Sequence, residues 1–295
     1  MTDPPAVTAP AAAPPRSRPG GPLRRRLASN TAVYVLVAIA VLVVALPLLW
    51  MLATAFKTDG QIVDLRSPLW PTSLDLGNLA QAWARAPFPR YFLNSAIFSV
   101  AATLGQVGSG LLAGYAFARF DFPGKRVLFY VALSGFMVPF TTVIVPVVEI
   151  LGDLGWLDTY QGLIVPNIAS ALGAFLFRQF FAGVPRELGE AASIDGASDF
   201  RIFRSVYAPL ARPMIAAFAI ISFLTNWNNF LFPLIVTNST DMMVLPLGLS
   251  VFETQFSVAY NLIMAASLIT IVPILIVAVA AQRQIVEGIT LGAIQ

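Results

Sequence analysis

Six long apolar segments without a charged side chain constrain this chain more than any other feature of its sequence. They are residues 33–56, 92–118, 127–148, 160–177, 214–236 and 261–282. The first would be about 36 Å long as an α-helix, enough to cross a hydrocarbon core of about 30 Å with some tilt. It is too long for the apolar region of a signal peptide, so we expect it to be retained. The segments predict an all-α, polytopic membrane protein with six transmembrane helices.

Prolines and glycines inside these segments predict where helices bend or approach one another. Kinks are expected at the four prolines of the third, fourth and sixth segments, Pro139, Pro146, Pro166 and Pro273. The pattern Gly110-x-x-x-Gly114 allows two helices to pack closely. Residues 242–252 form an apolar stretch that is too short to span a bilayer. We expect this stretch to be re-entrant or interfacial.

The composition narrows the class of protein further. Hydrophobic residues make up 57% of the chain and charged residues only 11%, whereas a soluble domain has about 25% charged residues. The absence of cysteine and histidine excludes disulfides, histidine metal sites and Ser-His-Asp triads. Gly124-Lys125 lacks the other residues of a G-x-x-x-x-G-K-[ST] phosphate loop. We therefore do not expect the chain to hydrolyse ATP through that motif.

The distribution of positive charge predicts the orientation in the membrane. If the N-terminus is cytoplasmic, so are 14 of the 18 basic residues, namely Arg16, Arg18, Arg24, Arg25, Arg26, Arg119, Lys125, Arg126, Arg178, Arg186, Arg201, Arg204, Arg212 and Arg283. Both termini and residues 178–213 are then cytoplasmic. Residues 1–29, rich in proline and alanine, are expected to be a disordered tail, and residues 30–295 to form the membrane domain. The outer residues 57–91, with Trp70 and Trp83, fit either a docking surface or an interfacial aromatic belt.

The cytoplasmic residues 182–213, called here the 182–213 loop, have the pattern of two short helices. Leu188 and Ala192 share one helical face, Gly196 breaks the first helix, and Ser198 is placed to cap the second. An apolar stripe follows at helical spacing, Phe200, Phe203, Val206, Tyr207 and Leu210. Amphipathic spacing alone equally fits a hairpin that lies on the membrane surface.

The fifth apolar segment contains a polar run, Asn226, Trp227, Asn228 and Asn229. Buried amides need hydrogen-bond partners. One hypothesis is that they line a polar cavity and bind a polyol, with Trp227 as a stacking face. The alternative is a hydrogen-bond clamp between helices. Since the six segments carry no charge, a neutral, hydroxyl-rich substrate fits them better than an ion does.

The order of residues in the 182–213 loop resembles that of a known family. Residues 190–197 (EAASIDGA), followed by 206–213 (VYAPLARP), are similar to the EAA loop of ABC importer permeases. Residues 114–125 (GYAFARFDFPGK), 227–230 (WNNF), 245–249 (LPLGL) and 286–293 (VEGITLGA) resemble the carbohydrate-importer permeases of the maltose-transporter type. The resemblance covers residues 30–295, and Asn229 stands where many members of the family have an acidic residue.

This resemblance implies a multi-pass permease of the inner membrane that pairs with a second, related permease. It further implies two copies of an ABC ATPase that bind the ATP, and an external solute-binding protein that delivers a carbohydrate. This chain would need no cofactor, metal or nucleic acid and would not be an enzyme. The residues that the resemblance assigns to coupling with the ATPase are Glu190, Ala191, Ala192, Asp195, Gly196, Ala197, Phe203 and Pro209.

Two other functions remain open on the residues alone. An ion-coupled secondary transporter would need no ATPase, and a membrane sensor would bind its ligand without transporting it. A membrane-embedded hydrolase is disfavoured because the chain has no cysteine or histidine. Uptake into vesicles with and without ATP separates these classes.

Overall fold

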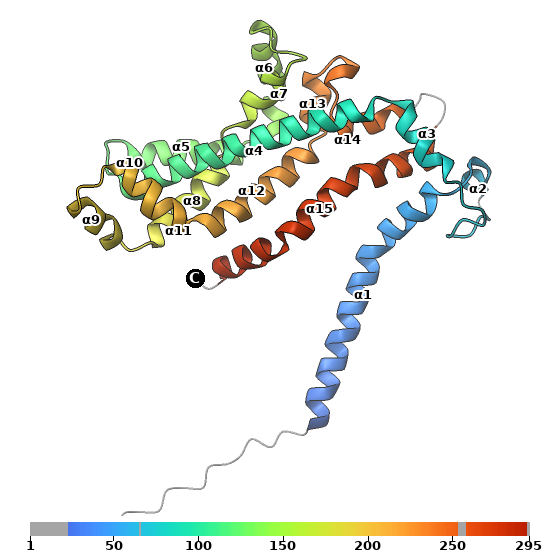
Figure 1. Cartoon of the computed structure of the whole chain (residues 1–295), viewed down its shortest axis with the longest axis horizontal. Helices are drawn as coiled ribbons and strands as arrows, with labels where there is room; N and C mark the ends of the chain where they lie inside the picture. The colour runs from blue at the N-terminus through green and yellow to red at the C-terminus, as the bar shows by residue number, and fades with distance from the viewer. Residues whose placement is uncertain (1–22, 65, 253–257, 294–295) are drawn as a thin grey trace, which may run out of the picture. The chain divides into compact units, whose positions relative to one another are not determined.

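The computed structural model describes residues 23–64, 66–252 and 258–293, and every regular element in these ranges is helical (Figure 1). The chain forms two compact units, residues 1–50 and 51–295. Helix α1 (Leu23–Ala55) makes up the described part of the first unit and ends in the second. Residues 1–22 of the predicted tail lie outside the described residues, whereas 23–29 belong to α1.

Four helical stretches are long and apolar enough to cross a membrane. They are Val33–Ala55 in α1, α4 (Phe88–Arg119), Tyr160–Gly183 and Tyr260–Ala280, the last within α15 (Tyr260–Ala293). Two bent helix pairs, Lys125–Met137 with Phe140–Asp153 and Asp199–Leu210 with Arg212–Trp227, raise the number to six if each pair is one span. The predicted all-α membrane fold is therefore confirmed.

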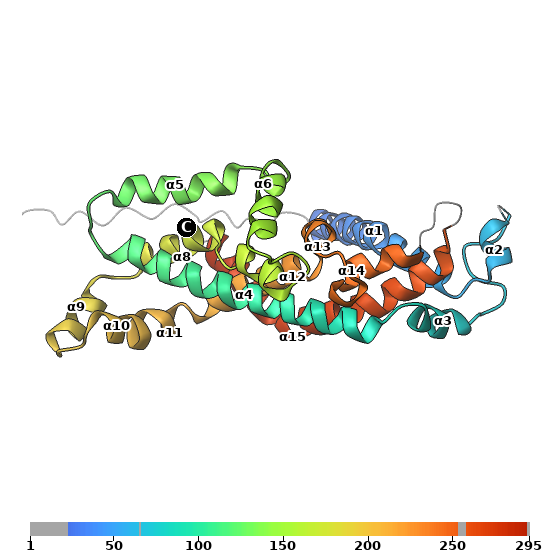
Figure 2. The ribbon, with the colours of Figure 1, turned by 90° about the horizontal axis from the view of Figure 1, so that it is seen from above.

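The third predicted span is the more sharply bent. Helices α5 (Lys125–Met137) and α6 (Phe140–Asp153) meet at 100°, and Figure 2 shows α6 turning away from α5. Pro139 causes the break because it lacks an N–H and disfavours helical geometry in the residue before it. Val138 accordingly has φ −81° and ψ 119°. At Pro139 the chain therefore bends by 100°, more sharply than the expected kink. Pro146 lies inside α6.

The fourth and fifth predicted spans are also interrupted. The fourth consists of α7 (Tyr160–Ile164), a 3-10 turn at Val165–Asn167 that contains Pro166, and α8 (Ala171–Gly183). The fifth consists of α12 (Arg212–Trp227) and α13 (Leu231–Val236). The single helix predicted for residues 214–236 is therefore wrong, because the chain leaves helical geometry after Trp227. Pro273 lies inside α15.

Helix α4 is the centre of the second unit. It packs along α8 and α12, and α12 packs along α15 (Figures 1 and 2). The contact with α8 is close because α4 presents glycines to it. A Cβ added at Gly114 would lie 2.5 Å from the Cβ of Phe177, and one at Gly110 would lie 3.0 Å from the carbonyl carbon of Gly173. The close packing predicted from the Gly110-x-x-x-Gly114 pattern is confirmed.

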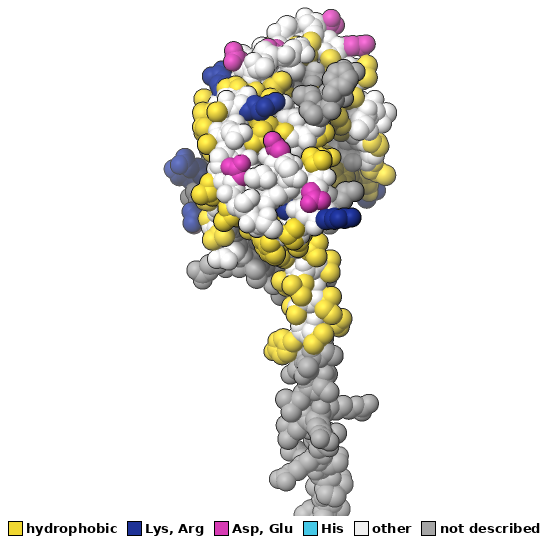
Figure 3. Space-filling model, turned by 90° about the vertical axis from the view of Figure 1, so that its right-hand side faces the viewer, with side chains coloured by type: hydrophobic (Ala, Val, Ile, Leu, Met, Phe, Trp, Pro, Cys, Tyr) yellow, Lys and Arg dark blue, Asp and Glu magenta, His cyan; other side chains and the backbone are white. Residues whose placement is uncertain are grey.

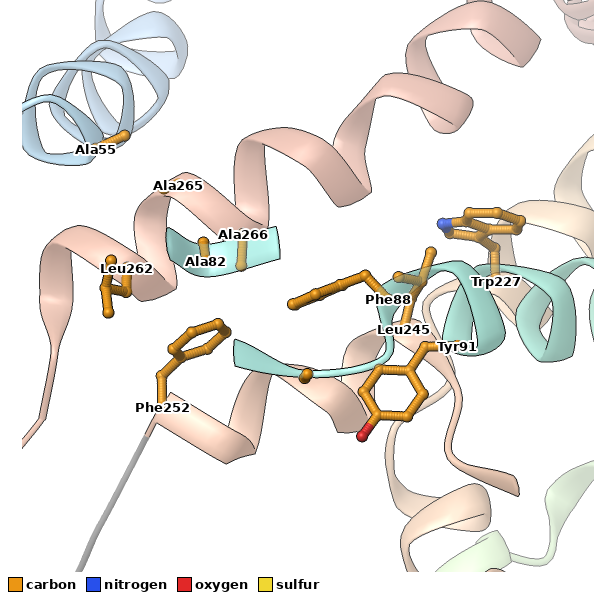
Figure 4. Close-up of a cluster of buried hydrophobic side chains, with 11 residues drawn as sticks. Ala55, Ala82, Phe88, Tyr91, Trp227, Leu245, Phe252, Leu262, Ala265 and Ala266 are labelled. Carbon is orange, nitrogen blue, oxygen red and sulfur yellow. The ribbon is translucent and has the colours of Figure 1, made fainter. Parts of the chain in front are cut away.

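Short elements complete the end of α4 that is remote from the 182–213 loop. They are α2 (Asp59–Val63), α3 (Gly77–Arg85), a 3-10 turn (Thr240–Met242), α14 (Leu245–Gly248) and a second 3-10 turn (Leu249–Phe252). Figure 3 shows charged side chains of both signs scattered over this end of the unit. Beneath them lies a buried cluster in which Phe88 and Tyr91 of α4 meet Phe252 and Leu262 (Figure 4). The 242–252 segment, as expected, forms no span.

Candidate functional site

The 182–213 loop forms a run of short helices. They are α9 (Glu187–Ile194), α10 (Asp199–Ile202), a π-helical turn (Phe203–Tyr207) and α11 (Ala208–Leu210). Gly196 ends the first of them in a left-handed conformation, with φ +80°, which glycine adopts without steric cost. The amide of Ala197 donates to the carbonyl of Ala192 at 3.0 Å and closes the turn. The predicted helix break at Gly196 is confirmed.

The prediction that the Ser198 side chain caps α10 is wrong. Ser198 has the extended backbone of an N-cap, but its hydroxyl accepts no amide hydrogen bond. Its carbonyl instead accepts from the amide of Ile202 at 2.9 Å. The π-helical turn that follows precedes Pro209, whose ring would clash with the carbonyl of Ser205 in a regular α-helix. The wider turn accommodates this proline within the helical run.

The residues assigned to coupling fall on two sides of the loop. Glu190, Ala191, Asp195 and Gly196 are exposed, whereas the partly buried members are Ala192, Ala197, Phe203 and Pro209. Two large apolar side chains stand beside the exposed set. Ile194 is 87% exposed and Phe200 is 67% exposed. Ile194 was not singled out from the sequence, although a large aliphatic residue beside Asp195 and Gly196 is the signal that would have found it.

The inner side of the loop packs on a cluster of aromatic residues from α4 and α8. Tyr115 of α4 lies at its centre, with its ring centroid 4.9 Å from Phe203, 5.2 Å from Tyr207 and 5.6 Å from Phe181. The buried members are Tyr115, Phe177, Phe181, Ile202, Tyr207, Ala211 and Phe218. The loop is therefore seated on the membrane helices through apolar packing, which contributes about 25 cal/mol per Å² of buried apolar surface.

Arg119, the last residue of α4, lies beside this cluster. Its Nη2 donates to the carbonyl of Phe181 at 2.6 Å and also to the carbonyl of Val184, at the C-terminus of α8. Carbonyls at a helix C-terminus attract a cation. The guanidinium also lies 4.5 Å from the centroid of the Tyr207 ring. A cavity of about 230 Å³ opens here and is lined by Arg119, Arg186, Glu190, Ser193, Asp199 and Tyr207, among others.

The polar run of the fifth segment is divided by the end of α12. Asn226 is buried, and its Nδ2 donates to Gln106 Oε1 at 3.3 Å and lies 3.4 Å from Thr103 Oγ1. Trp227 is also buried, with its ring against Phe92 and Phe223. Asn228 is exposed and Asn229 half-buried. Asn226 thus forms a hydrogen bond between α12 and α4, and the Trp227 ring packs between Phe92 and Phe223.

A larger cavity, of about 640 Å³, lies between α4, α5, α8 and α12. Its polar side chains are Gln106, Ser109, Ser170, Ser222 and Thr225, and none of its lining residues is charged. Gln106 is fixed in place because it accepts from Asn226 and donates to the carbonyl of Asn167 at 2.9 Å. The sequence pointed to the neighbouring amides and missed this cavity, because the serines and Gln106 come from different segments.

The loops near the ends of α7 and α13 are held together by Asp158. Its Oδ1 accepts from the amides of Asn238 at 2.9 Å and Ser239 at 3.0 Å. Burial alone would raise the pKa of Asp158, but these hydrogen bonds outweigh it and lower the pKa below its ordinary value. The carboxylate is thus a structural acceptor that joins two loops.

Known proteins resemble this chain in sequence, and a solved structure resembles it in fold. Residues 106–290 match a family described as binding-protein-dependent transport system inner membrane component. The diacetylchitobiose uptake system permease protein NgcG of Streptomyces coelicolor is 38% identical over 273 residues, which is 91% of this chain and 89% of that protein. The arabinooligosaccharides transport system permease protein AraQ of Halalkalibacterium halodurans is 34% identical, over 84% of this chain and 90% of that protein.

Two further known proteins are similar to this chain, one in sequence and one in fold. The sn-glycerol-3-phosphate transport system permease protein UgpE of Salmonella typhimurium is 33% identical over 87% of this chain and 94% of that protein. A chain in the crystal structure of a bacterial ABC transporter involved in the import of the acidic polysaccharide alginate has the same fold, with a TM-score of 0.79. That match covers 90% of this chain and 99% of the other, at 20% identity.

Proposed function

This chain belongs to the family of binding-protein-dependent transport system inner membrane components, and we propose that it is the permease subunit of an ATP-driven carbohydrate importer. An external solute-binding protein delivers the carbohydrate, and a pair of ABC ATPases drives its passage. A second, related permease forms the other half of the pore. ATP hydrolysis takes place in the ATPases, and both termini of this chain are cytoplasmic.

The 182–213 loop is the observation that carries this proposal. It presents Glu190, Ile194 and Phe200 outward, while its inner face packs on the aromatic cluster at Tyr115. Exposed apolar side chains rimmed by charged ones are typical of a protein-binding surface. A surface hairpin on lipid would instead direct its apolar stripe away from the protein, yet Phe203 and Tyr207 of that stripe face α4. This arrangement supports a site for the ATPase.

The 640 Å³ cavity supports a neutral carbohydrate as the substrate. Hydroxyl and amide groups at its wall, from Ser109, Ser222, Thr225 and Gln106, suit the hydroxyls of a sugar. The absence of charge among its lining residues disfavours a phosphate ester, such as the one in the printed name of UgpE. Two of the relatives carry oligosaccharides in their names. Of the polar run at the end of α12, Asn228 and Asn229 stay accessible and remain candidates for the pathway.

The contact with the ATPase is tested by copurification from native membranes in mild detergent. Charge reversal, Glu190→Arg, should remove the ATPase from the purified complex, because Glu190 lies on the exposed side of α9. Glu149→Arg makes the same change at an exposed position of α6 and should leave the ATPase bound. An unchanged amount of ATPase with Glu190→Arg would overturn the assignment of the loop.

The transport reaction is tested in proteoliposomes that contain the whole complex with its binding protein. Uptake of a labelled β-linked disaccharide or arabinooligosaccharide should require ATP and should persist when ion gradients are collapsed. Uptake that follows an ion gradient without ATP would instead establish a secondary transporter. Binding without accumulation would establish a sensor, and selective uptake of glycerol phosphate would contradict the neutral pathway.

A further inference from the structure

One side chain, Tyr207, contacts three of the elements around the 182–213 loop. Its ring lies against Tyr115 of α4 at 5.2 Å and Phe181 of α8 at 6.1 Å, and it is only 3% exposed. Its hydroxyl lies against α9, where a Cβ added at Gly189 would be 2.6 Å from the oxygen. A residue larger than glycine at position 189 would therefore displace the tyrosine. Tyr207 therefore joins α9 to α4 and α8.

Arg119 also contacts the Tyr207 ring. Its guanidinium is held by two carbonyls at the end of α8, those of Phe181 and Val184, and one face of it lies 4.5 Å from the Tyr207 centroid. The contact is a cation–π interaction between a half-buried arginine and a buried ring, at the wall of the 230 Å³ cavity. Arg119 belongs to α4, so it joins the ends of α4 and α8 to the loop in a single contact.

Helix α9 depends on this arrangement because it has little other attachment. None of its residues, Glu187–Ile194, is buried. Apart from the contact of Gly189 with Tyr207, its apolar attachment to the aromatic cluster is the partly buried Ala192. The helix that carries Glu190 and Ile194 would therefore pivot on its own if the Tyr207 contact were lost.

We propose that Arg119 and Tyr207 form the joint that makes α9 move as one body with α4 and α8. This proposal rests on the proposed function, since it assumes that the ATPase displaces α9. Both are positioning residues, because neither lies on the exposed face of the loop. With the joint intact, a displacement of α9 is passed to the helices that line the 640 Å³ cavity. Without it, α9 follows the ATPase while α4 stays in place.

The joint is tested first by distances in the assembled transporter. The chain has no natural cysteine, so Glu187→Cys in α9 and Leu112→Cys in α4, both exposed, give a unique spin-label pair. Pulsed dipolar spectroscopy should return the same distance with and without trapped nucleotide. In Tyr207→Leu the distance should change between the two states. A label distance that changes with nucleotide while Arg119 and Tyr207 are intact would refute the proposal. A label distance that stays the same in Tyr207→Leu would also refute it.

The second test is the number of solute molecules taken up for each ATP hydrolysed. Tyr207→Leu and Arg119→Met should reduce this ratio severalfold, because α9 then moves without α4, while ATPase activity persists. Tyr207→Phe loses the hydroxyl but keeps the ring, whose Cε2 and Cζ also lie against α9, 3.3 Å from a Cβ added at Gly189. It should therefore restore most of the ratio. Phe129→Leu removes another cation–π pair, with Arg178 at 4.3 Å, and should leave the ratio unchanged.

The outcomes separate the two proposals. If the unaltered complex lacks ATP-driven uptake, the proposed function fails, and the joint with it. If the unaltered complex transports normally and Tyr207→Leu keeps the full ratio, only the joint fails. A loss of the ratio in Phe129→Leu as large as in Tyr207→Leu would also refute the joint, because general loosening of the fold would then explain both.

Discussion

At the scale of single residues, the glycines of α4 differ sharply in what surrounds them. A Cβ at Gly114 would meet the Cβ of Phe177 at 2.5 Å and the backbone nitrogen of Arg178 at 2.8 Å. A Cβ at Gly108 would meet nothing within 4 Å. The same substitution should therefore have opposite effects at two positions six residues apart.

We expect Gly114→Ala to destabilise the protein by about 1–3 kcal/mol, the usual effect of overpacking, because α4 and α8 must separate. Gly108→Ala is the matched control and should leave stability equal or slightly higher, since alanine favours the helix. Thermal unfolding in detergent measures both. A lower melting temperature for Gly108→Ala than for Gly114→Ala would contradict the close contact.

Asp158 gives a prediction about pH. Its pKa is lower in the folded protein than in the unfolded chain, so its stabilising effect is complete above the unfolded value of about 4 and is lost as the pH falls through the folded value. Asp158→Asn keeps an acceptor oxygen but does not titrate. The difference in melting temperature between the two proteins should therefore be present at about pH 7 and shrink toward pH 3. A difference that grows in acid would contradict the assignment.

At the scale of elements, the ends of helices decide whether the 182–213 loop keeps its form. Gly196 and Gly155 both have positive φ, +80° and +66°, and a Cβ added at either would meet nothing within 4 Å. A side chain at either position strains the backbone by about 1–2 kcal/mol. The two glycines lie in different loops, after α9 and after α6, so equal strain should have different consequences.

We expect Gly196→Ala to lower the amount of ATPase that copurifies, because relief of the strain would displace α9, which carries Glu190. Gly155→Ala should keep the ATPase bound, although it is strained to a similar extent. Quantitative copurification of the assembled complex provides the measurement. Equal losses in both variants would show that backbone strain acts through the whole fold and not through the loop.

The sequence predicted the elements better than their junctions. The apolar segments, the close glycine packing and the break at Gly196 follow from local rules, and all three are found. The turn at Val138 is larger than the expected kink, because a proline removes a hydrogen bond but does not specify how far the chain then turns. The end of α12 at Trp227 has no glycine or proline beside it to announce it.

The candidate site was predicted only in part, for a related reason. The sequence indicated the loop but not what holds it, because Arg119 and Tyr207 belong to different motifs and meet only in the folded chain. It also indicated the amides of the fifth segment as a pathway. Asn226 is bonded to Gln106, a partner that could not be known before the packing of α4 against α12, and the pathway stays a prediction.

At the scale of the whole molecule, the proposed contact with a cytoplasmic ATPase depends on the orientation of the chain in the membrane. The 182–213 loop and the turn after α6 are predicted to lie on opposite sides. Arg201 and Leu154 are exposed in these two segments. Because the natural chain lacks cysteine, each position can be labelled uniquely.

We expect a membrane-impermeant thiol reagent to label Arg201→Cys only in inside-out vesicles and Leu154→Cys only in right-side-out vesicles. The excess of basic residues near the loop is the physical reason. Labelling of both positions from the same side would contradict the six-span arrangement. The opposite pattern would invert the orientation and remove the loop from the side of a cytoplasmic ATPase.

The seam between α4 and α8 also bears on how this protein can change over generations. Gly110 faces Gly173 and Gly114 faces Phe177 without spare volume, so an enlargement on one side is tolerated only with a reduction on the other. Such paired changes are rare, because the first step alone is harmful. Descendants of this gene should therefore inherit the seam as one unit, while position 108, which faces open space, varies freely.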